Sequence, residues 1–240
     1  MNSFISFNSL FLHMGLIRVI KDIQVRLEAI PSPGAIFYNA IIKRILGKSE
    51  LQIAQEIVQE IDKGILIDVG SGTGFLSIEI GKRAPELTIY GIDLSRKMVE
   101  IASGNARGLS NIKFKLANAV ALPFENDSID LIVSTGSFHH WKQPLKVFNE
   151  CYRVLKENQE VWIYDGCSNP PNDEIFKLKR KYGIFKFRIL SQIQRLHGFT
   201  WEVYNTKIKR LLERSKFKKN VQMILTDGWM KIVLKKYHGS

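Results

Sequence analysis

Three glycines alternate along the chain at Gly70, Gly72 and Gly74, directly after a short β-branched run that begins at Ile65. Glycine lets the backbone adopt positive φ and lets a ligand approach the main chain without a Cβ in the way. A carboxylate, Asp93, follows about 20 residues after the loop, at the end of a second apolar run, where it can accept hydrogen bonds from ribose hydroxyls. This spacing predicts a site for an adenosine-type cofactor.

The residues around the loop argue against two other nucleotide-binding patterns. A dinucleotide fingerprint, G-x-G-x-x-G, would need a glycine where the chain has Phe75. A phosphate-binding P-loop would need a lysine directly after Gly74, and Phe75 again stands there. The pattern that remains is D-x-G-x-G-x-G, from Asp68 to Gly74.

This pattern resembles the glycine loop of class I S-adenosylmethionine-dependent methyltransferases, of the small-molecule, methyltransferase type 11-like kind. The resemblance covers residues from about 64 to 165 and includes further motifs in the family's order. It implies S-adenosyl-L-methionine as the cofactor and an α/β fold, a doubly wound Rossmann-like seven-stranded sheet that is mostly parallel, with an antiparallel final strand and helices on both faces. The further motifs are Tyr90-Gly-Ile-Asp93, Ala117-Asn-Ala-Val-Ala-Leu-Pro-Phe124, Phe138-His-His-Trp141 and Arg153-Val-Leu-Lys156.

Two positions depart from the family's pattern. Asn118 stands where the family commonly has an aspartate that accepts a hydrogen bond from the adenine amino group, and its side-chain oxygen can still accept one without charge. Glu157-Asn-Gln-Glu160 replaces a Pro-Gly-Gly turn, which we expect to alter a surface turn rather than the chemistry. The cofactor-binding residues that the resemblance implies are Asp68, Gly70, Ser71, Gly72, Gly74, Asp93, Leu94, Asn118, Ala119 and Thr135.

Two histidines, His139 and His140, are the candidate catalytic residues because they follow the fourth predicted strand, beside the expected position of the methyl group. Methyl transfer depends mainly on holding the acceptor close to the methyl carbon, and a base helps when the acceptor must lose a proton. Histidine titrates near neutral pH and can serve as that base. In the alternative, one histidine packs against Trp141 or caps the next turn and the other only lines the pocket. The sequence does not choose between them.

The elements that must position these residues alternate between strands and helices. Strands are predicted near residues 65–69, 88–93, 112–117, 129–134 and 160–165, and helices near 75–83, 95–106 and 144–155. Such alternation favours a parallel sheet with right-handed crossovers, whose ligands bind at the carboxyl ends of the strands. We expect an N-terminal helical lid over residues 1–48 and a cofactor-binding domain over 49–240 with a basic insertion at about 166–200. A helix is also predicted near 201–215, and Asp227-Gly228 predicts a final hairpin.

The charge of the chain is concentrated in one segment. Of its 35 Lys and Arg residues, 14 lie between Phe176 and Asn220, where the only carboxylates are Glu202 and Glu213. Basic residues interleaved with aromatic ones suit RNA, an anionic membrane surface or an anionic small molecule, and a solvated helix face explains them equally well. We expect a small-molecule acceptor, with an anionic one among the candidates. An RNA methyltransferase that uses residues 176–220 and a non-catalytic cofactor-binding protein are the alternatives.

Length and composition limit the number of domains, the possibility of a membrane span and the cellular compartment. A chain of 240 residues suits one domain with decorations. No run reaches the roughly 20 apolar residues of a membrane span, no metal-ligand spacing occurs, and peripheral membrane contact stays open. The two cysteines, Cys151 and Cys167, suggest reduced thiols in a cytoplasmic protein. The oligomeric state is not predicted.

Overall fold

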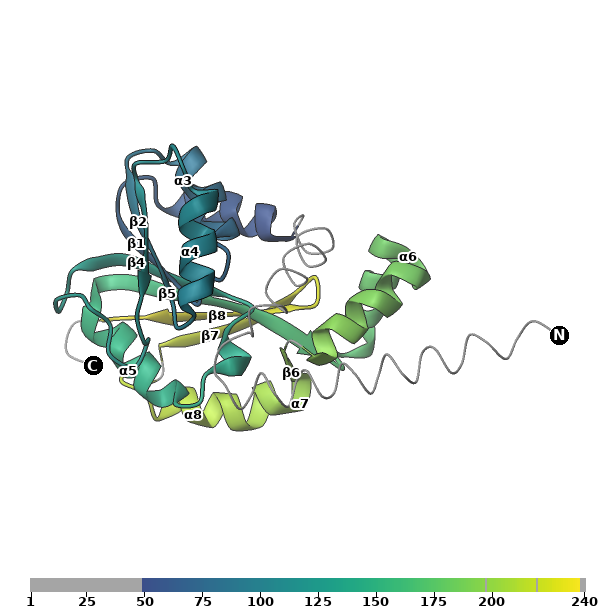
Figure 1. Ribbon diagram of the computed structural model, residues 1–240. Helices are drawn as coiled ribbons and strands as arrows, with labels where there is room; N and C mark the ends of the chain where they lie inside the picture. The colour runs from purple at the N-terminus through teal and green to yellow at the C-terminus, as the bar shows by residue number, and fades with distance from the viewer. Residues whose placement is uncertain (1–48, 197, 219, 238–240) are drawn as a thin grey trace.

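The computed structural model describes residues 49–196, 198–218 and 220–237, and the expected N-terminal lid at 1–48 lies outside them (Figure 1). A helix over residues 49–60 precedes a central sheet with helices on both faces. The predicted elements of the first two thirds are present within a few residues of their expected ends. In chain order these are β1 (Gly64–Val69), α3 (Phe75–Arg83), β2 (Leu87–Asp93), α4 (Arg96–Asn105), β3 (Ile112–Leu116), β4 (Ile129–Thr135), the 3₁₀ turn η1 (Phe138–His140), α5 (Pro144–Val154) and β5 (Leu155–Ser168).

In the last third of the chain the helical segments are divided into shorter pieces than the sequence predicts. The insertion is a helical segment, α6 (Asn172–Leu196), interrupted at Gly183, whose φ of 75° and ψ of 160° are not helical. A short strand, β6 (Gly198–Thr200), follows. The single helix predicted near 201–215 is divided into α7 (Trp201–Val203), the π-helical turn η2 (Tyr204–Ile208) and α8 (Lys209–Glu213). The final hairpin is β7 (Val221–Thr226) and β8 (Trp229–Lys235), as Asp227-Gly228 predicts.

The sheet confirms the expected mostly parallel, doubly wound topology. Its order is β3-β2-β1-β4-β5-β8-β7, in which the first five strands are parallel and β8 runs antiparallel to both neighbours. The structure adds an eighth strand, because β6 pairs in parallel with the end of β5 outside this order. The replaced turn at 157–160 is drawn into β5, where Asn158 adopts a left-handed φ of 63° and the register against β4 shifts.

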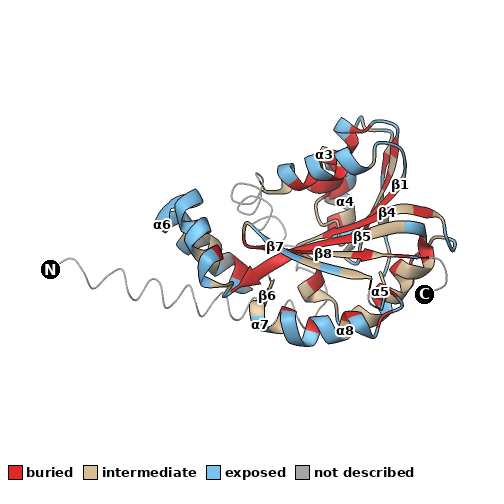
Figure 2. Cartoon of the chain, turned by 180° about the vertical axis from the view of Figure 1, so that it is seen from behind, coloured by how far each residue is buried: buried red, intermediate tan, exposed pale blue. Residues whose placement is uncertain are grey.

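Apolar side chains cover both faces of the sheet, as alternate strand residues point to opposite sides. The helix over 49–60 and α3 pack on one face, where Ile57, Leu66 and Ile80 are fully buried. On the other face α5, η2 and α8 surround Phe148 and Tyr204. Figures 1 and 2 show these two helical layers with the sheet between them, and α6 projecting away from one end. Within the described residues, no helix is both long and apolar enough to cross a bilayer.

The pairing of β6 with β5 requires a residue without a side chain at Gly198. A Cβ there would lie 2.0 Å from the carbonyl oxygen of Gly166, which is main chain and cannot rotate away. We expect Gly198→Ala to lower the free energy of unfolding by about 2 kcal/mol, measured by urea denaturation. The matched control is Gly104→Ala in α4, where a Cβ meets nothing within 4 Å and should raise stability by about 0.5–1 kcal/mol. Equal effects of the two substitutions would contradict this account of β6.

Candidate functional site

The candidate site lies at the carboxyl ends of β1 and β4, where the strand order reverses direction. In doubly wound sheets this switch point opens a crevice that binds ligands. The glycine loop follows β1, and the turn η1 with both histidines follows β4. Ser137 joins the two, because its hydroxyl contacts the Ser134 hydroxyl at 2.8 Å and donates to the carbonyl of Val69 at 3.0 Å. Ser137 was not among the residues predicted from the sequence.

The loop glycines have the conformations for which glycine is required. Gly70, Gly72 and Gly74 have φ values of 74°, 53° and 80°. A Cβ on Gly70 would lie 2.4 Å from the Ser137 hydroxyl, so this glycine also permits close contact between the two segments. The amides of Gly70 and Ser71 donate to the carbonyl of Ile92 at 2.8 and 3.0 Å, which holds the loop against the end of β2.

Asp93 ends β2 and faces this loop. Its Oδ2 accepts from the amide of Gly72 at 2.9 Å, and its Oδ1 accepts from the amide of Ser95 at 2.8 Å. Burial raises the pKa of Asp93, and these amide hydrogen bonds oppose the shift. Each carboxylate oxygen has two lone pairs, so both can accept a further hydrogen bond from a ligand. Its position is the one expected of a ribose-binding carboxylate.

Asp68 is buried in β1 and only half satisfied. Its Oδ2 accepts from the Ser77 hydroxyl at 2.7 Å, while its Oδ1 has no hydrogen-bond partner among the described residues. Burial raises the pKa of Asp68 to about 6, and the nearby charge of Asp93 adds to the shift. The buried hydroxyl of Ser71 also lacks a partner within the described chain. Buried polar atoms are nearly always satisfied, so these two atoms fit a site that is completed by a polar, positively charged ligand.

The remaining residues predicted to bind the cofactor follow β2 and β3 or end β4. Leu94 directly follows Asp93 and its side chain is exposed. Asn118 follows β3, and its Oδ1 accepts from the amide of Val120 at 3.1 Å, which fixes the orientation of the side-chain amide. Ala119 packs partly against the core beneath. Thr135 is the last residue of β4 and lies beside Tyr164 of β5. The roles of these residues toward a cofactor stay predictions.

The two histidines have different environments. The ring of His139 is buried, and its Nδ1 lies 2.8 Å from Oδ1 of Asp165, whose carboxylate also accepts from the His139 amide at 2.7 Å. Since a carboxylate can only accept, Nδ1 carries the proton and Nε2 is the basic nitrogen of the neutral ring. The His140 ring contacts this ring at a tilt of 46°, with centroids 3.9 Å apart. Trp141 packs edge-on against Phe138 at 5.2 Å.

Asp165 is the main residue of the candidate site that was not predicted from the sequence. It is fully buried near the end of β5, and its side chain reaches η1 across 26 residues of sequence. A signal was available, because Asp165 follows an apolar run in the same way as Asp93 does. Among the described residues, no group of three His, Cys, Asp or Glu side chains is arranged to hold a metal ion.

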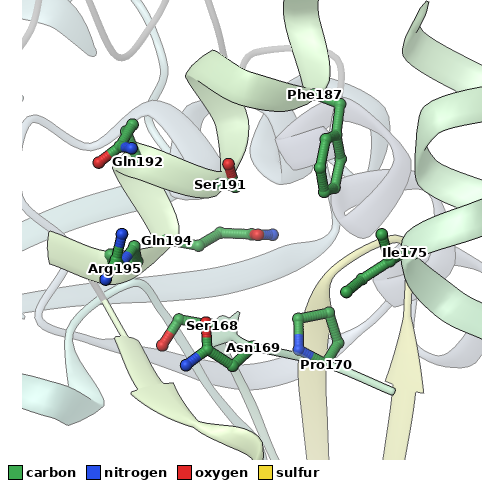
Figure 3. Close-up of a pocket in the computed structure, with 9 residues that line it drawn as sticks. All are labelled: Ser168, Asn169, Pro170, Ile175, Phe187, Ser191, Gln192, Gln194 and Arg195. Atoms are coloured by element: carbon green, nitrogen blue, oxygen red, sulfur yellow. The ribbon is translucent and has the colours of Figure 1, made fainter. Parts of the chain in front are cut away.

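A pocket of about 210 Å³ lies beyond the carboxyl end of β5, three residues after Asp165 (Figure 3). In the close-up Phe187 and Ile175 lie on one side of it, and the side chain of Gln194 points toward them from the other side. Polar groups line most of the remainder. The lining residues are Ser168, Asn169, Pro170, Ile175, Phe187, Ser191, Gln192, Gln194 and Arg195.

Comparison with known proteins gives consistent results. The sequence pattern of the family described as "Methyltransferase domain" matches residues 62–225, more than half of the chain. A demethylmenaquinone methyltransferase from Thermotoga maritima is 33% identical over 121 residues, which are 50% of this chain and 51% of the relative. A ubiquinone/menaquinone biosynthesis C-methyltransferase from Geotalea daltonii is 29% identical over 60% of this chain and 63% of its own length. The chain thus spans about half to two thirds of the length of these curated relatives.

A solved structure from Methanococcus maripaludis, described as a putative S-adenosyl-L-methionine-dependent methyltransferase, superimposes with a TM-score of 0.69. Its sequence is 27% identical, and the match covers 87% of this chain and 94% of that one. The similarity therefore extends over the whole sheet rather than the glycine loop alone.

Proposed function

This chain belongs to the class I S-adenosylmethionine-dependent methyltransferases, and from that premise we propose that it transfers a methyl group to a small organic molecule. The observation that carries the proposal is the convergence of Asp68, Asp93 and the His139–Asp165 pair at one switch point of the sheet. Asp68 and Asp93 would bind the positively charged cofactor. The His139–Asp165 pair would accept the proton that the methyl acceptor loses.

We assign the cofactor site to residues of four strand ends. Asp93 accepts hydrogen bonds from the ribose, Asn118 accepts one from the adenine amino group, and Leu94 supplies an apolar contact. The unsatisfied Oδ1 of Asp68 would hold the positively charged part of the cofactor beside the glycine loop. When bound, S-adenosylmethionine supplies an electrophilic methyl carbon on a sulfonium, which is already a good leaving group.

For the reaction we propose that His139 removes the proton from the nucleophilic atom of the acceptor through Nε2. Asp165 is a positioning residue, because it keeps the proton on Nδ1 and stabilises the ring once it becomes positively charged. His140 shields one face of the His139 ring rather than acting as the base.

The acceptor class follows from the relatives and the pocket. The names of the Thermotoga and Geotalea relatives describe methyltransferases of demethylmenaquinone and of ubiquinone/menaquinone biosynthesis, so we propose an acceptor of the same small-molecule class. The pocket lies at the carboxyl end of β5, the strand that carries Asp165, and we assign the outer part of the acceptor to it. Its glutamine, serine and arginine side chains suit an acceptor with oxygen substituents.

Transfer of a labelled methyl group to cell extract tests the proposal directly. Purified protein is incubated with labelled cofactor and extract, which is then divided into small-molecule, RNA and protein fractions. We expect label in the small-molecule fraction. Label confined to RNA would replace the proposal with the RNA alternative, and no transfer to any fraction would favour a non-catalytic role.

Asp93→Asn is expected to weaken the affinity for S-adenosylmethionine by about 2 kcal/mol, or roughly thirtyfold, since charge-assisted hydrogen bonds become neutral ones. Isothermal titration calorimetry measures the change. Asp130→Asn is the matched control. Asp130 also accepts a hydrogen bond from a backbone amide, that of Ile65 at 2.9 Å, but it lies at the amino end of β4, away from the glycine loop. An unchanged dissociation constant for Asp93→Asn would refute the assigned role.

We also propose that the protein acts in the cytoplasm. Cys151 and Cys167 are buried free thiols rather than a disulfide, as expected in a reducing compartment.

A further inference from the structure

We infer that α6 is a docking surface for an anionic lipid bilayer. This goes beyond the proposed function and does not depend on it, since binding to a membrane requires neither the cofactor nor methyl transfer. The inference rests on apolar exposure, on charge and on the way in which α6 is anchored.

The most exposed large apolar side chains of the described residues are all on α6. They are Phe185, Phe176 and Ile184, with 77%, 70% and 64% of their surfaces exposed, whereas the other exposed ones reach only 37–46%. Ile184 and Phe185 directly follow the break at Gly183, so they lie together at the bend between the two helical halves. Adjacent apolar side chains with such exposure mark an interaction surface, whereas scattered ones do not.

Cations surround this apolar bend. α6 carries seven Lys and Arg residues against two carboxylates, Asp173 and Glu174. Lys177 and Lys181 are engaged with Asp173 and Asp227 respectively, at 3.7 and 2.7 Å. Within the part of the chain that the structure describes, no carboxylate lies within 4 Å of the charged groups of four others, which are Lys179, Arg180, Lys186 and Arg188.

The base of α6 is firmly attached to the protein, which holds the outer surface in a fixed orientation. Glu174 accepts from the amide of Gly228 at 3.2 Å, and Gln194 donates to the carbonyl of the same glycine at 2.7 Å. Leu178 is buried beneath the first half. Figure 2 shows the outer side of α6 as mostly exposed where it projects from the sheet. The exposed apolar residues therefore belong to a segment that is attached to the sheet near both of its ends.

This combination matches the interfacial region of a membrane. Phe and Ile side chains insert below the headgroups, while Lys and Arg extend to anionic lipids above them. RNA is the less suitable partner, because Ile184, which offers no aromatic face for stacking, occupies the bend beside Phe185.

Vesicle flotation of the full chain tests the inference. We expect binding to vesicles of phosphatidylcholine mixed with phosphatidylglycerol, and little binding to phosphatidylcholine alone. Ile184→Ser/Phe185→Ser should lower the partition coefficient at least about tenfold, and Lys186→Gln/Arg188→Gln by a similar factor that shrinks at high salt. The matched controls are Leu51→Ser/Ile224→Ser, two exposed apolar residues elsewhere, and Lys207→Gln/Lys209→Gln, two exposed cations on η2 and α8. Wild-type binding that does not depend on anionic lipid, or bend variants that bind as the wild type does, would overturn the inference.

A fluorescent probe at Phe185→Cys separates other occupants of the surface. Burial raises the pKa of the Cys151 and Cys167 thiols to about 12, so the introduced cysteine should be labelled selectively. We expect emission typical of water in buffer and of an apolar medium on anionic vesicles. Apolar emission without vesicles would assign the surface to another part of this chain or, if it rises with protein concentration, to a second copy. Apolar emission with bulk tRNA but not with vesicles would assign it to nucleic acid.

Discussion

Replacing His139 by Asn is expected to slow methyl transfer by roughly 10²–10⁴-fold while it leaves the affinity for S-adenosylmethionine nearly unchanged. The Asn amide can still donate to Asp165 in place of Nδ1, so the packing around the buried carboxylate is largely retained. What is lost is Nε2, the only basic nitrogen of the neutral ring. The rate of label transfer to the small-molecule fraction and the cofactor dissociation constant together separate catalysis from binding.

His140→Asn is the matched control for this substitution. Because the proposal gives His140 only a packing role against the His139 ring, its replacement should cost less than about tenfold in rate. The opposite ranking of the two variants would transfer the role of base to His140. Comparable, small losses in both would show that the acceptor needs no base.

Asp165→Asn tests the positioning role of the carboxylate. An Asn can accept from Nδ1 but cannot stabilise the positively charged ring, so we expect the rate to fall and the rising limb of its pH profile to move to lower pH. A residue with only a structural role would lower the rate without moving the profile. Thermal denaturation of the variant controls for loss of fold.

The sequence predicted the features that depend on local backbone requirements. Positive φ is required at Gly70, Gly72 and Gly74, and a tight turn at Asp227-Gly228. Because these conformations favour particular residue types, they can be recognised from the sequence. The strands were recognised because apolar residues accumulate in short runs that are buried on both faces. The class of fold and the place of the cofactor loop follow from these features.

The features that were missed depend on contacts between distant segments. Asp165 contacts His139 because β5 lies next to β4 in the sheet. The residues around Asp165 in the sequence do not indicate this partner. The eighth strand forms because Gly198 can approach Gly166 closely, which a three-residue segment does not indicate by itself. The insertion was recognised as basic, but its division into two helical halves depends on the conformation of one glycine, Gly183.

Replacing Asp68 by Asn is expected to make the cofactor-free protein more stable at neutral pH. Burial raises the pKa of Asp68 from 3.8 to about 6, so the folded state holds this proton more tightly than the unfolded state does. Stability that depends on the neutral carboxyl is fully present below about pH 4 and is lost as the pH rises to about 6. The loss amounts to at most about 3 kcal/mol above that range. Because the amide that replaces the carboxyl has no charge to bury, the variant should escape this loss.

The measurement is urea denaturation of wild type and Asp68→Asn between about pH 4 and pH 7.5, compared as the difference in unfolding free energy. We expect the difference to move in favour of the variant as the pH rises, and then to level off. Asp173→Asn, at an exposed carboxylate of α6, is the control whose difference should stay constant. Parallel curves for wild type and Asp68→Asn would show that burial of Asp68 has no energetic cost.

The same experiment with saturating S-adenosylmethionine should reverse the order of the two proteins at neutral pH. A cationic ligand stabilises the ionised carboxylate of Asp68, so wild type binds more tightly and gains more stability from mass action than the variant does. For the same reason the affinity of the wild type should fall below about pH 6, where Asp68 becomes protonated, and that of the variant should not. The cofactor-free protein would then be less stable because the buried carboxylate of Asp68 lacks a partner. The same carboxylate would strengthen binding of the positively charged cofactor.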